Sequence, residues 1–463
     1  MTQEANFARP FNETITLNLL SNYFSETAMN FLPRVVRLGV FGLCVVGTTW
    51  LGGCARQGPE GASLVEKHGN KIVIDFWNGF TGPDGKTMEK MVKQFQAQNR
   101  DVEVRMQIIP WGTYYDKLTL SLAYGGAPEV FIMPAARLPE FAAFDTLKPI
   151  DSLLATGGPP LKSEQFAPVP WRASFYKGRQ LALPLDVHPI GLYYNTKLFE
   201  EAGIVDENGK AKPPRTLQEF LDAARKITKD TNKDGRPDQW GFVFTNQRSN
   251  WLTFTGQFGG SILSPDLTTC VIDSDANRKA SQLMHDFIYK YKIAPRPEGV
   301  DAWLAFRQGK VGMAMEGIYM LTSLQEQKGL HFAGAPVPQF GPQGAVWGGS
   351  HLLSQPNGIA PEASRAAWRF MRFLSDNSYE WATGGQVPAR LSIQRSPQFA
   401  ALSVQAQFAR QLPVVQYESL SPRANAIFPF VDPAIEAVLL DLQTPEAALK
   451  DSQRRIDQVM KRP

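Results

Sequence analysis

Hydrophobic positions alternate with polar ones from residue 71 onward and predict repeated strand–helix–strand units. Residues 71–77 carry apolar side chains at every second position, which is typical of a strand. A Gly- and Pro-containing turn at 81–85 leads to a helical apolar stripe over 88–95, and a second alternating strand follows at 102–108. Such βαβ units build parallel sheets that are covered by helices. A short apolar strand at 129–133 fits the same sheet.

The same pattern returns in the second half of the chain. Strands are predicted at 192–195 and 311–315, and helical stripes lie at 363–374 and near the C-terminus. Thr216 and Glu219 have the spacing of a capping box, which predicts that a helix begins after Thr216. Because 463 residues are too many for one ordinary core, we expect two α/β lobes.

The first 54 residues carry a different pattern. Arg34 and Arg37 precede an apolar run at 38–51 that ends in Leu-Gly-Gly-Cys, which indicates a secretory signal. The run is shorter than the ~20 apolar residues that a membrane-spanning helix needs, so a transmembrane anchor is the weaker interpretation. The ending resembles the lipobox of bacterial lipoproteins, which implies that Cys54 carries a lipid and becomes the first residue of the mature chain.

This interpretation divides the N-terminal region into two parts. Residues 1–53 would be an N-terminal extension with the signal peptide, and residues 54–70 a lipidated tether rich in Gly, Pro and charge. The segment after Met29 has the proportions of a typical signal, so we hypothesise that translation starts there. The mature protein is expected outside the cytoplasm, anchored to a membrane by its lipid.

Composition and charge exclude several classes of protein. The chain is 43% hydrophobic and 20% charged, as expected for a globular protein. Lys and Arg total 48 against 44 Asp and Glu, and no basic stripe stands out, so nucleic-acid binding has no electrostatic support. Cys44 falls in the signal, Cys54 takes the lipid and Cys270 is left alone, so the mature chain has no disulfide pair and no cysteine cluster for a metal.

Four segments occur along the chain in a characteristic order. They are IDFWNGFTGPDG at 74–85, GGAPEV at 125–130, a segment that runs from PLD through LYYN to AG at 184–203, and the pattern F..GK..MAM.G at 306–317. In this order and spacing they resemble the family 1 extracellular solute-binding proteins, the relatives of maltose-binding protein. Glu129 takes the place of an Asp that is usual in the second segment. The resemblance covers residue 71 to the C-terminus.

The resemblance implies a two-lobed, periplasmic-binding-protein-like α/β fold of type II, with a hinge and a ligand cleft between discontinuous lobes. Lobe 1 would comprise 71–185 and 355–405, and lobe 2 would comprise 186–354 and 406–463. It also implies a monomeric, non-enzymatic substrate-binding subunit of an ABC importer. This subunit would capture a sugar, in the first place an oligosaccharide, and deliver it to the transmembrane permease subunits. Binding in a cleft lets both lobes contact the ligand and exclude water.

Aromatic residues beside amides are candidate sugar contacts, because a pyranose has apolar C–H faces and a rim of hydroxyls. Trp77 and Asn78 stand at the carboxyl end of the first strand, where open α/β sheets place ligands. Asn246 and Trp251 follow a strand of the second lobe, in a segment that contacts ligand in relatives. Tyr319 stands where relatives often have a stacking Trp. For both tryptophans, a place in the core is the alternative.

Further candidates lie at the predicted crossings between the lobes. They are Asp186, His188, Trp347, Gly349, Ser350 and Arg390. The Trp-Gly-Gly-Ser segment resembles a loop near the hinge that touches ligand, although its glycines could serve only a tight turn. A lone histidine such as His188 is more often a structural hydrogen-bonding residue than a ligand contact. Arg390 could equally pair with a carboxylate of the protein.

Residues 230–241 match the start of a calcium loop. Oxygen-bearing side chains stand at positions 1, 3, 5 and 9, and these residues are Asp230, Asn232, Asp234 and Asp238. Position 6 is Gly, but position 12 is Gly241, so the usual bidentate Glu is missing. The segment predicts either a structural calcium site or a solvated, Asx-rich turn. We expect no other cofactor.

Three alternatives to sugar capture stay open. A glycoside hydrolase would need two carboxyl groups a few Å apart, and nothing in the sequence pairs Asp75, Asp186 or Glu316. No His-Glu-x-x-His motif or nucleophile elbow occurs. A binder of glycerol phosphate would need a cluster of cations, and a polyamine binder an acidic cage. A sensory partner of a membrane receptor is the third alternative.

Overall fold

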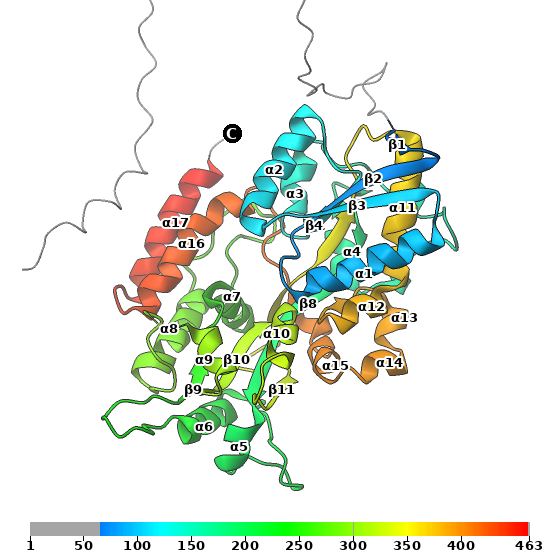
Figure 1. Cartoon of the computed structure of the whole chain (residues 1–463). Coiled ribbons are helices and arrows are strands. Elements are labelled where there is room, and N and C mark those ends of the chain that lie inside the picture. Colours follow the sequence, from blue (N-terminus) through cyan, green and yellow to red (C-terminus); the bar gives the residue numbers. More distant parts are fainter. Residues whose placement is uncertain (1–64, 300, 462–463) are drawn as a thin grey trace, which may run out of the picture. The chain divides into compact units, whose positions relative to one another are not determined.

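The computed structural model describes residues 65–299 and 301–461. The predicted signal, Cys54 and most of the predicted tether lie outside these residues. Within them, no helix combines the length and the apolar character that crossing a membrane requires. Two main β-sheets, each with its own hydrophobic core, organise this part of the chain (Figure 1).

The first sheet follows the predicted βαβ pattern. Its strands are β1 (Lys67–His68), β2 (Lys71–Asn78), β3 (Val102–Ile108), β4 (Val130–Pro134), β7 (Leu183–Pro184) and β13 (His351–Ser354). β2 pairs in parallel with β3 and β4, and the antiparallel strand β13 links β4 to β7. Its helices are α1 (Pro83–Gln98), α2 (Trp111–Tyr124), α3 (Leu138–Ala143), α4 (Pro168–Ala173), α11 (Pro361–Asp376) and α12 (Ser378–Thr383). The strands predicted at 71–77, 102–108 and 129–133 are confirmed.

Helices cover both faces of this sheet. Ile74 and Phe76 of β2 belong to one core with side chains of α1 and α11, whereas Trp77 and Phe131 belong to another with side chains of α2 and α3. Strands of a parallel sheet that is covered on both sides are apolar at consecutive positions. This arrangement explains why Trp77 is buried although it lies outside the alternating stripe.

The second sheet is built around β8. Its strands are β8 (Asp186–Asn195), β9 (Trp240–Val243), β10 (Val311–Gly317), β11 (Phe332–Ala335), β12 (Val346–Gly349), β14 (Val387–Pro388) and β15 (Val415–Gln416). β8 is antiparallel to β10, β11, β12 and β14, and all its residues are buried. β8 is longer than the strand predicted at 192–195. The prediction missed its first half because Pro189 and Gly191 interrupt the apolar pattern there. A Cβ at Gly191 would lie 2.2 Å from the Phe408 ring, so only glycine fits there.

Helices also flank the second sheet. They are α5 (Thr196–Glu201), α6 (Leu217–Ile227), α7 (Gln247–Gln257), α8 (Asp275–Tyr289), α9 (Ala302–Arg307), α10 (Leu321–Gln325), α16 (Ala424–Leu439) and α17 (Pro445–Met460). The predicted start of α6 is confirmed, because the Thr216 hydroxyl accepts a hydrogen bond of 3.2 Å from the backbone N–H of Glu219. Shorter elements are β5 (Phe175–Tyr176), β6 (Arg179–Gln180), α13 (Leu391–Gln394), α14 (Pro397–Ala400) and α15 (Ser403–Ala409).

Three segments cross between the sheets and are hydrogen-bonded to one another. Leu185, between β7 and β8, donates its N–H to the carbonyl of His351 and accepts from the N–H of Ala389, both at 3.0 Å. Residues 185–186, 349–351 and 388–389 therefore form one ribbon, which we call the hinge ribbon. The two sheets with their helices are the two lobes that it connects.

Two segments lie in a different lobe from the one that the sequence pattern assigns. The pattern places 351–354 in lobe 2, but β13 pairs with β4 of the first sheet. It places residues up to 405 in lobe 1, but Val404 of α15 packs in the same core as Tyr193 of β8. The glycines before Ser350 indicate a crossing, but the chain passes directly from β12 into β13, so the sequence does not show that the residues after Ser350 join the first sheet.

Candidate functional site

A cavity of about 240 Å³ lies where the two lobes and the hinge ribbon meet. It is lined by Tyr115 and residues 134–137 from the first lobe, by His188 and residues 347–350, and by Arg248, Tyr417, Glu418, Asn425 and Phe428 from the second lobe. Residues 134–137 begin at the carboxyl end of β4, the edge at which α/β sheets usually place their ligands. Both lobes contribute to this one site.

Aromatic rings and guanidinium groups dominate the walls of the cavity. The Arg137 guanidinium lies 4.1 Å from the centre of the Tyr115 ring, and that of Arg248 lies 4.3 Å from the Phe428 ring. Trp347 adds an indole from the hinge side. Flat rings beside hydrogen-bond donors suit a ligand with both apolar faces and polar edges.

The positive charges of Arg137 and Arg248 are each paired with carboxylates. Arg137 lies 3.3 Å from Glu140, and Arg248 lies 3.0 Å from Asp432 and 3.8 Å from Glu418. Burial raises the pKa of Glu418, while Arg248 and the Trp347 side chain counteract this shift. The cavity therefore has no surplus of positive charge.

Behind His188, a fully buried carboxylate organises the hinge. Both oxygens of Asp186 are engaged: Oδ1 accepts from the backbone N–H of His351 at 2.8 Å, and Oδ2 accepts from the Trp381 indole at 2.7 Å. The Nδ1 atoms of His351 and His188 lie 2.7 and 3.3 Å from the same carboxylate. Burial alone would raise the pKa of Asp186, but the two histidines outweigh it and hold that pKa well below its usual range.

Asp186, His188 and His351 are also the only acidic, histidine or cysteine side chains in residues 65–299 and 301–461 that form a group of three with ligand atoms within 4.8 Å of one another. The carboxylate already accepts hydrogen bonds from Trp381 and from the His351 backbone. Hydrogen bonding accounts for this arrangement without an ion.

The free energy of unfolding is expected to fall as the pH drops from about 7 to 5. Burial and the charge of His351 lower the pKa of His188 in the folded protein, so the unfolded chain takes up this proton first, near the ordinary pKa of about 6.5. Stability falls wherever the unfolded state binds more protons. Asp186, whose pKa is also lowered, adds a loss of the same sign below its unfolded pKa of about 3.9.

Urea denaturation at several pH values measures this slope. His188→Gln should flatten it, whereas His331→Gln, at an exposed position, should leave it as in the wild type. Equal slopes in all three proteins would show that His188 does not carry the effect.

The structure gathers several of the sequence candidates at the cavity. His188, Trp347, Gly349 and Ser350 line it. The Tyr319 ring lies 6.0 Å from the His188 ring, and its hydroxyl donates a hydrogen bond of 3.0 Å to Glu316. Asn246 caps α7 and lines an adjoining cavity with Arg248.

The other tryptophan candidates lie in the cores. Trp77 packs in the first lobe with Lys117 over its ring at 4.3 Å, and Trp251 is fully buried with its indole donating to Ser281 at 2.8 Å. Asn78 is also fully buried, and its Oδ1 accepts from the N–H of Phe80. These three side chains do not line the cavity.

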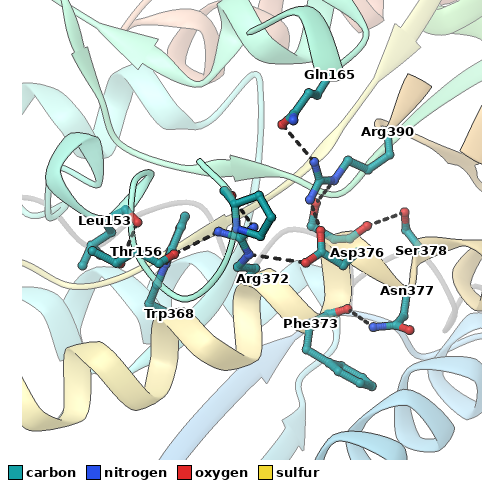
Figure 2. A network of polar contacts seen from close by, with 12 residues as sticks. Leu153, Thr156, Gln165, Trp368, Arg372, Phe373, Asp376, Asn377, Ser378 and Arg390 are labelled. Atoms are coloured by element: carbon teal, nitrogen blue, oxygen red, sulfur yellow. Dashed lines mark hydrogen bonds and ion pairs between the residues drawn. The ribbon is translucent and has the colours of Figure 1, made fainter. Parts of the chain in front are cut away.

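Arg390 belongs to a structural network of the first lobe (Figure 2). Its guanidinium pairs with Asp376, donates to Ser375 at 3.0 Å and to Gln165 at 3.3 Å, and lies 4.6 Å from the Phe166 ring. Burial lowers the pKa of Arg390 to about 10. The pairing with a carboxylate of the protein, one of the two sequence interpretations, is the arrangement in the structure.

Sequence reasoning missed Tyr115, Arg137 and the residues from α16 and the segment before it. A signal for the first two was present. Arg137 lies three residues after β4, and Tyr115 lies in the first turns of α2, the helix that follows β3. The same rule about carboxyl ends of strands would have selected them. Tyr417 and Phe428 carry no such signal, because a long-range contact brings them to the hinge.

The segment with Asp230, Asn232, Asp234 and Asp238 is an exposed turn whose carboxylates accept hydrogen bonds from their own loop. Asp230 accepts from the N–H of Gly235 at 2.8 Å, and Asp238 from the N–H of Thr231 at 2.7 Å. Asn232 and Asp234 each accept from the N–H two residues further on, at 3.0 and 2.9 Å, and these two bonds are those of Asx turns. Calcium binding at this loop stays a prediction.

Comparison with known proteins identifies what the chain resembles. Residues 80–381 match the family described as bacterial extracellular solute-binding protein. The sn-glycerol-3-phosphate-binding periplasmic protein of Escherichia coli K12 is 25% identical over 433 residues, covering 84% of this chain and 93% of that protein.

Solved structures with sugars share the fold. An ABC substrate-binding protein of Listeria monocytogenes in complex with cycloalternan has a TM-score of 0.72 at 23% identity, covering 84% of this chain and 98% of that one. The maltose/maltodextrin-binding domain of Bdellovibrio bacteriovorus, bound to maltotriose, has a TM-score of 0.72 at 21% identity, covering 84% and 100%. The predicted two-lobed α/β fold is confirmed.

Proposed function

Because this chain belongs to the family of bacterial extracellular solute-binding proteins, we propose that it is the lipid-anchored substrate-binding subunit of an ABC importer. It captures a sugar, in the first place an oligosaccharide, in the cavity between its lobes and delivers it to the permease. The observation that carries the sugar proposal is the lining of this cavity, where aromatic rings from both lobes stand beside charge-compensated donors.

The charge of the cavity favours a neutral ligand. A phosphate ester would require cationic side chains that are free to pair with it. Arg137 and Arg248 instead have carboxylate partners at 3.3 and 3.0 Å. Glycerol phosphate is the second candidate ligand, because the relative from Escherichia coli is named for binding it.

The lining also favours binding over hydrolysis. Glycoside hydrolysis requires two carboxyl groups that face each other across the scissile bond. Of the described residues that line the cavity, Glu418 is the only carboxylate. Asp75 pairs with Arg105 at 2.7 Å on the surface of the first lobe, and Glu316 is held by Tyr319 and the backbone of Gly317.

Calorimetry against a panel of neutral mono- and oligosaccharides and sn-glycerol 3-phosphate tests the proposal, with chromatography of each mixture for products. Sugar binding without turnover is the expected result. Binding of glycerol phosphate alone would replace the sugar proposal with the second candidate, and sugar cleavage would refute simple capture.

Trp347→Ala is expected to weaken sugar binding by about 1–3 kcal/mol, because the indole would lose its apolar contact with a sugar face. Calorimetry with the tightest sugar of the panel measures the change. Trp240→Ala is the matched control, since Trp240 is also half-buried but lies at the start of β9, away from the cavity. Unchanged affinity in Trp347→Ala would remove this ring from the site.

Cys54→Ser is expected to abolish lipidation and to release the protein from membranes. The lipobox-like Leu-Gly-Gly-Cys sequence motivates this expectation. Metabolic labelling with a fatty acid, followed by membrane fractionation, measures both effects. Retention of label in Cys54→Ser would place the lipid elsewhere.

A further inference from the structure

Two further cavities lie next to the interlobe cavity in the second lobe. One, of about 410 Å³, is lined by residues 245–248 together with Asp432, Ile435 and Glu436 of α16. The other, of about 250 Å³, is lined by residues 243–245, Gln247, Pro295, Pro297 and residues 301–303. We call them the middle and the distal hollow.

Shared lining residues place the three spaces next to one another in a row. Arg248 lines both the interlobe cavity and the middle hollow. Thr245 and Gln247 line both the middle and the distal hollow. The row therefore extends from His188 at the hinge, past Arg248 and Gln247, to Trp303.

The topology of the second sheet explains why these spaces share one edge. β9 and β10 are parallel, with Phe242 opposite Met313, so their carboxyl ends point the same way. Residues 243–248 continue from the end of β9, and β10 ends at Gly317, close to Tyr319 and His188. The row thus follows the ligand-binding edge of an α/β sheet.

The chemistry of the distal hollow repeats that of the interlobe cavity. Trp303 supplies an indole whose N–H is buried and has no hydrogen-bond acceptor in the described part of the chain. Two proline rings add apolar surface, and Thr245, Gln247 and Asp301 add polar groups. An aromatic ring next to polar side chains suits a sugar ring with its hydroxyls.

Side chains of both positive and negative charge line the middle hollow. Arg248 lies 3.0 Å from Asp432, and Glu436 stands on the same helix as Asp432. Neither a polyanion nor a polycation gains from such a lining. A neutral, hydroxyl-rich chain can cross it with hydrogen bonds alone.

We propose that the three spaces form one extended site and that the ligand is a linear oligosaccharide whose far end binds against Trp303. This inference rests on the proposed function and specifies the length and shape of the sugar. The interlobe cavity, at about 240 Å³, is smaller than the roughly 300–1,000 Å³ of typical ligand pockets. The row as a whole falls within that range.

A chain-length series tests the proposal by calorimetry on the whole mature protein. The probes are linear malto-, cello- and xylo-oligosaccharides of two to six units. For the series that binds, affinity should rise with length, and Trp303→Ala should lower the affinity for the longest members tenfold or more while leaving the disaccharide unchanged. Gln247→Ala should act in the same direction.

Two controls distinguish a loss of sugar binding from a folding defect. Trp303 packs near Tyr193 and Phe306, so thermal unfolding of Trp303→Ala is recorded alongside, and Gln247→Ala provides a variant outside that core. Leu304→Ala, at the neighbouring and exposed position of α9, should bind every length as the wild type does.

Each outcome supports or overturns a definite claim. Affinity that is independent of length, or an equal loss for all lengths in Trp303→Ala, would overturn the extended site and leave sugar capture intact. Failure of the wild type to bind any sugar would overturn the proposed function, and the extended site with it.

Discussion

Asp186→Ala is expected to lower the free energy of unfolding by about 3–5 kcal/mol, the usual cost of removing one partner from a buried, charged network. The substitution would leave the indole N–H of Trp381 and the backbone N–H of His351 without an acceptor in a region that water does not reach. Each buried donor without a partner costs about 1–3 kcal/mol. It would also remove the charge that holds His188 and His351 in place.

Urea denaturation at pH 7 measures this loss. Glu207→Ala serves as the control, because Glu207 is exposed in a turn of the second lobe and its removal should change stability by less than about 0.5 kcal/mol. A loss below about 1 kcal/mol in Asp186→Ala would mean that the hinge does not depend on this carboxylate.

Trp251→Ala is expected to destabilise the protein by about 3–5 kcal/mol, as large-to-small substitutions of fully buried tryptophans do. The cavity would open inside the core of the second lobe, and Ser281 would lose the indole donor at 2.8 Å. The affinity of the folded variant for sugar should match the wild type, because Trp251 does not line the cavity.

Denaturation and calorimetry on the same sample separate these two effects. Trp347→Ala should show the reverse pattern, with weaker binding and a smaller loss of stability. Weaker binding by folded Trp251→Ala would mean that the core position transmits changes to the site.

The sequence predicts the first lobe well because its elements are local. Strand, helix and strand from β2 to β3 follow one another within a short segment, and each has a clear period. The pattern fails for Trp77 because a period of two predicts one buried face, whereas helices bury both faces of this sheet.

Trp251 illustrates a second limit. It lies in α7, where polar and apolar residues are mixed and most of both kinds are buried, so no apolar stripe shows which side chains point inward. A tryptophan in such a helix looks the same in the sequence whether it faces a core or a cleft.

Candidates near the crossings were easier to recognise. His188, Trp347 and Ser350 are at the cavity because they are adjacent to the segments that connect the lobes. The opposite wall, with Tyr417 and Phe428, depends on how α16 and the segment before it fold back onto the hinge. Contacts of that kind depend on tertiary packing and leave no period in the sequence.

The hinge ribbon limits how the lobes can move. Leu185 is bonded on one side to His351 and on the other to Ala389, so the crossing segments cannot slide past one another without breaking backbone hydrogen bonds. A strip of paired strands bends out of its plane far more easily than it shears. The two lobes should therefore open and close by one bending motion of the hinge ribbon, and they should not reorient independently of each other.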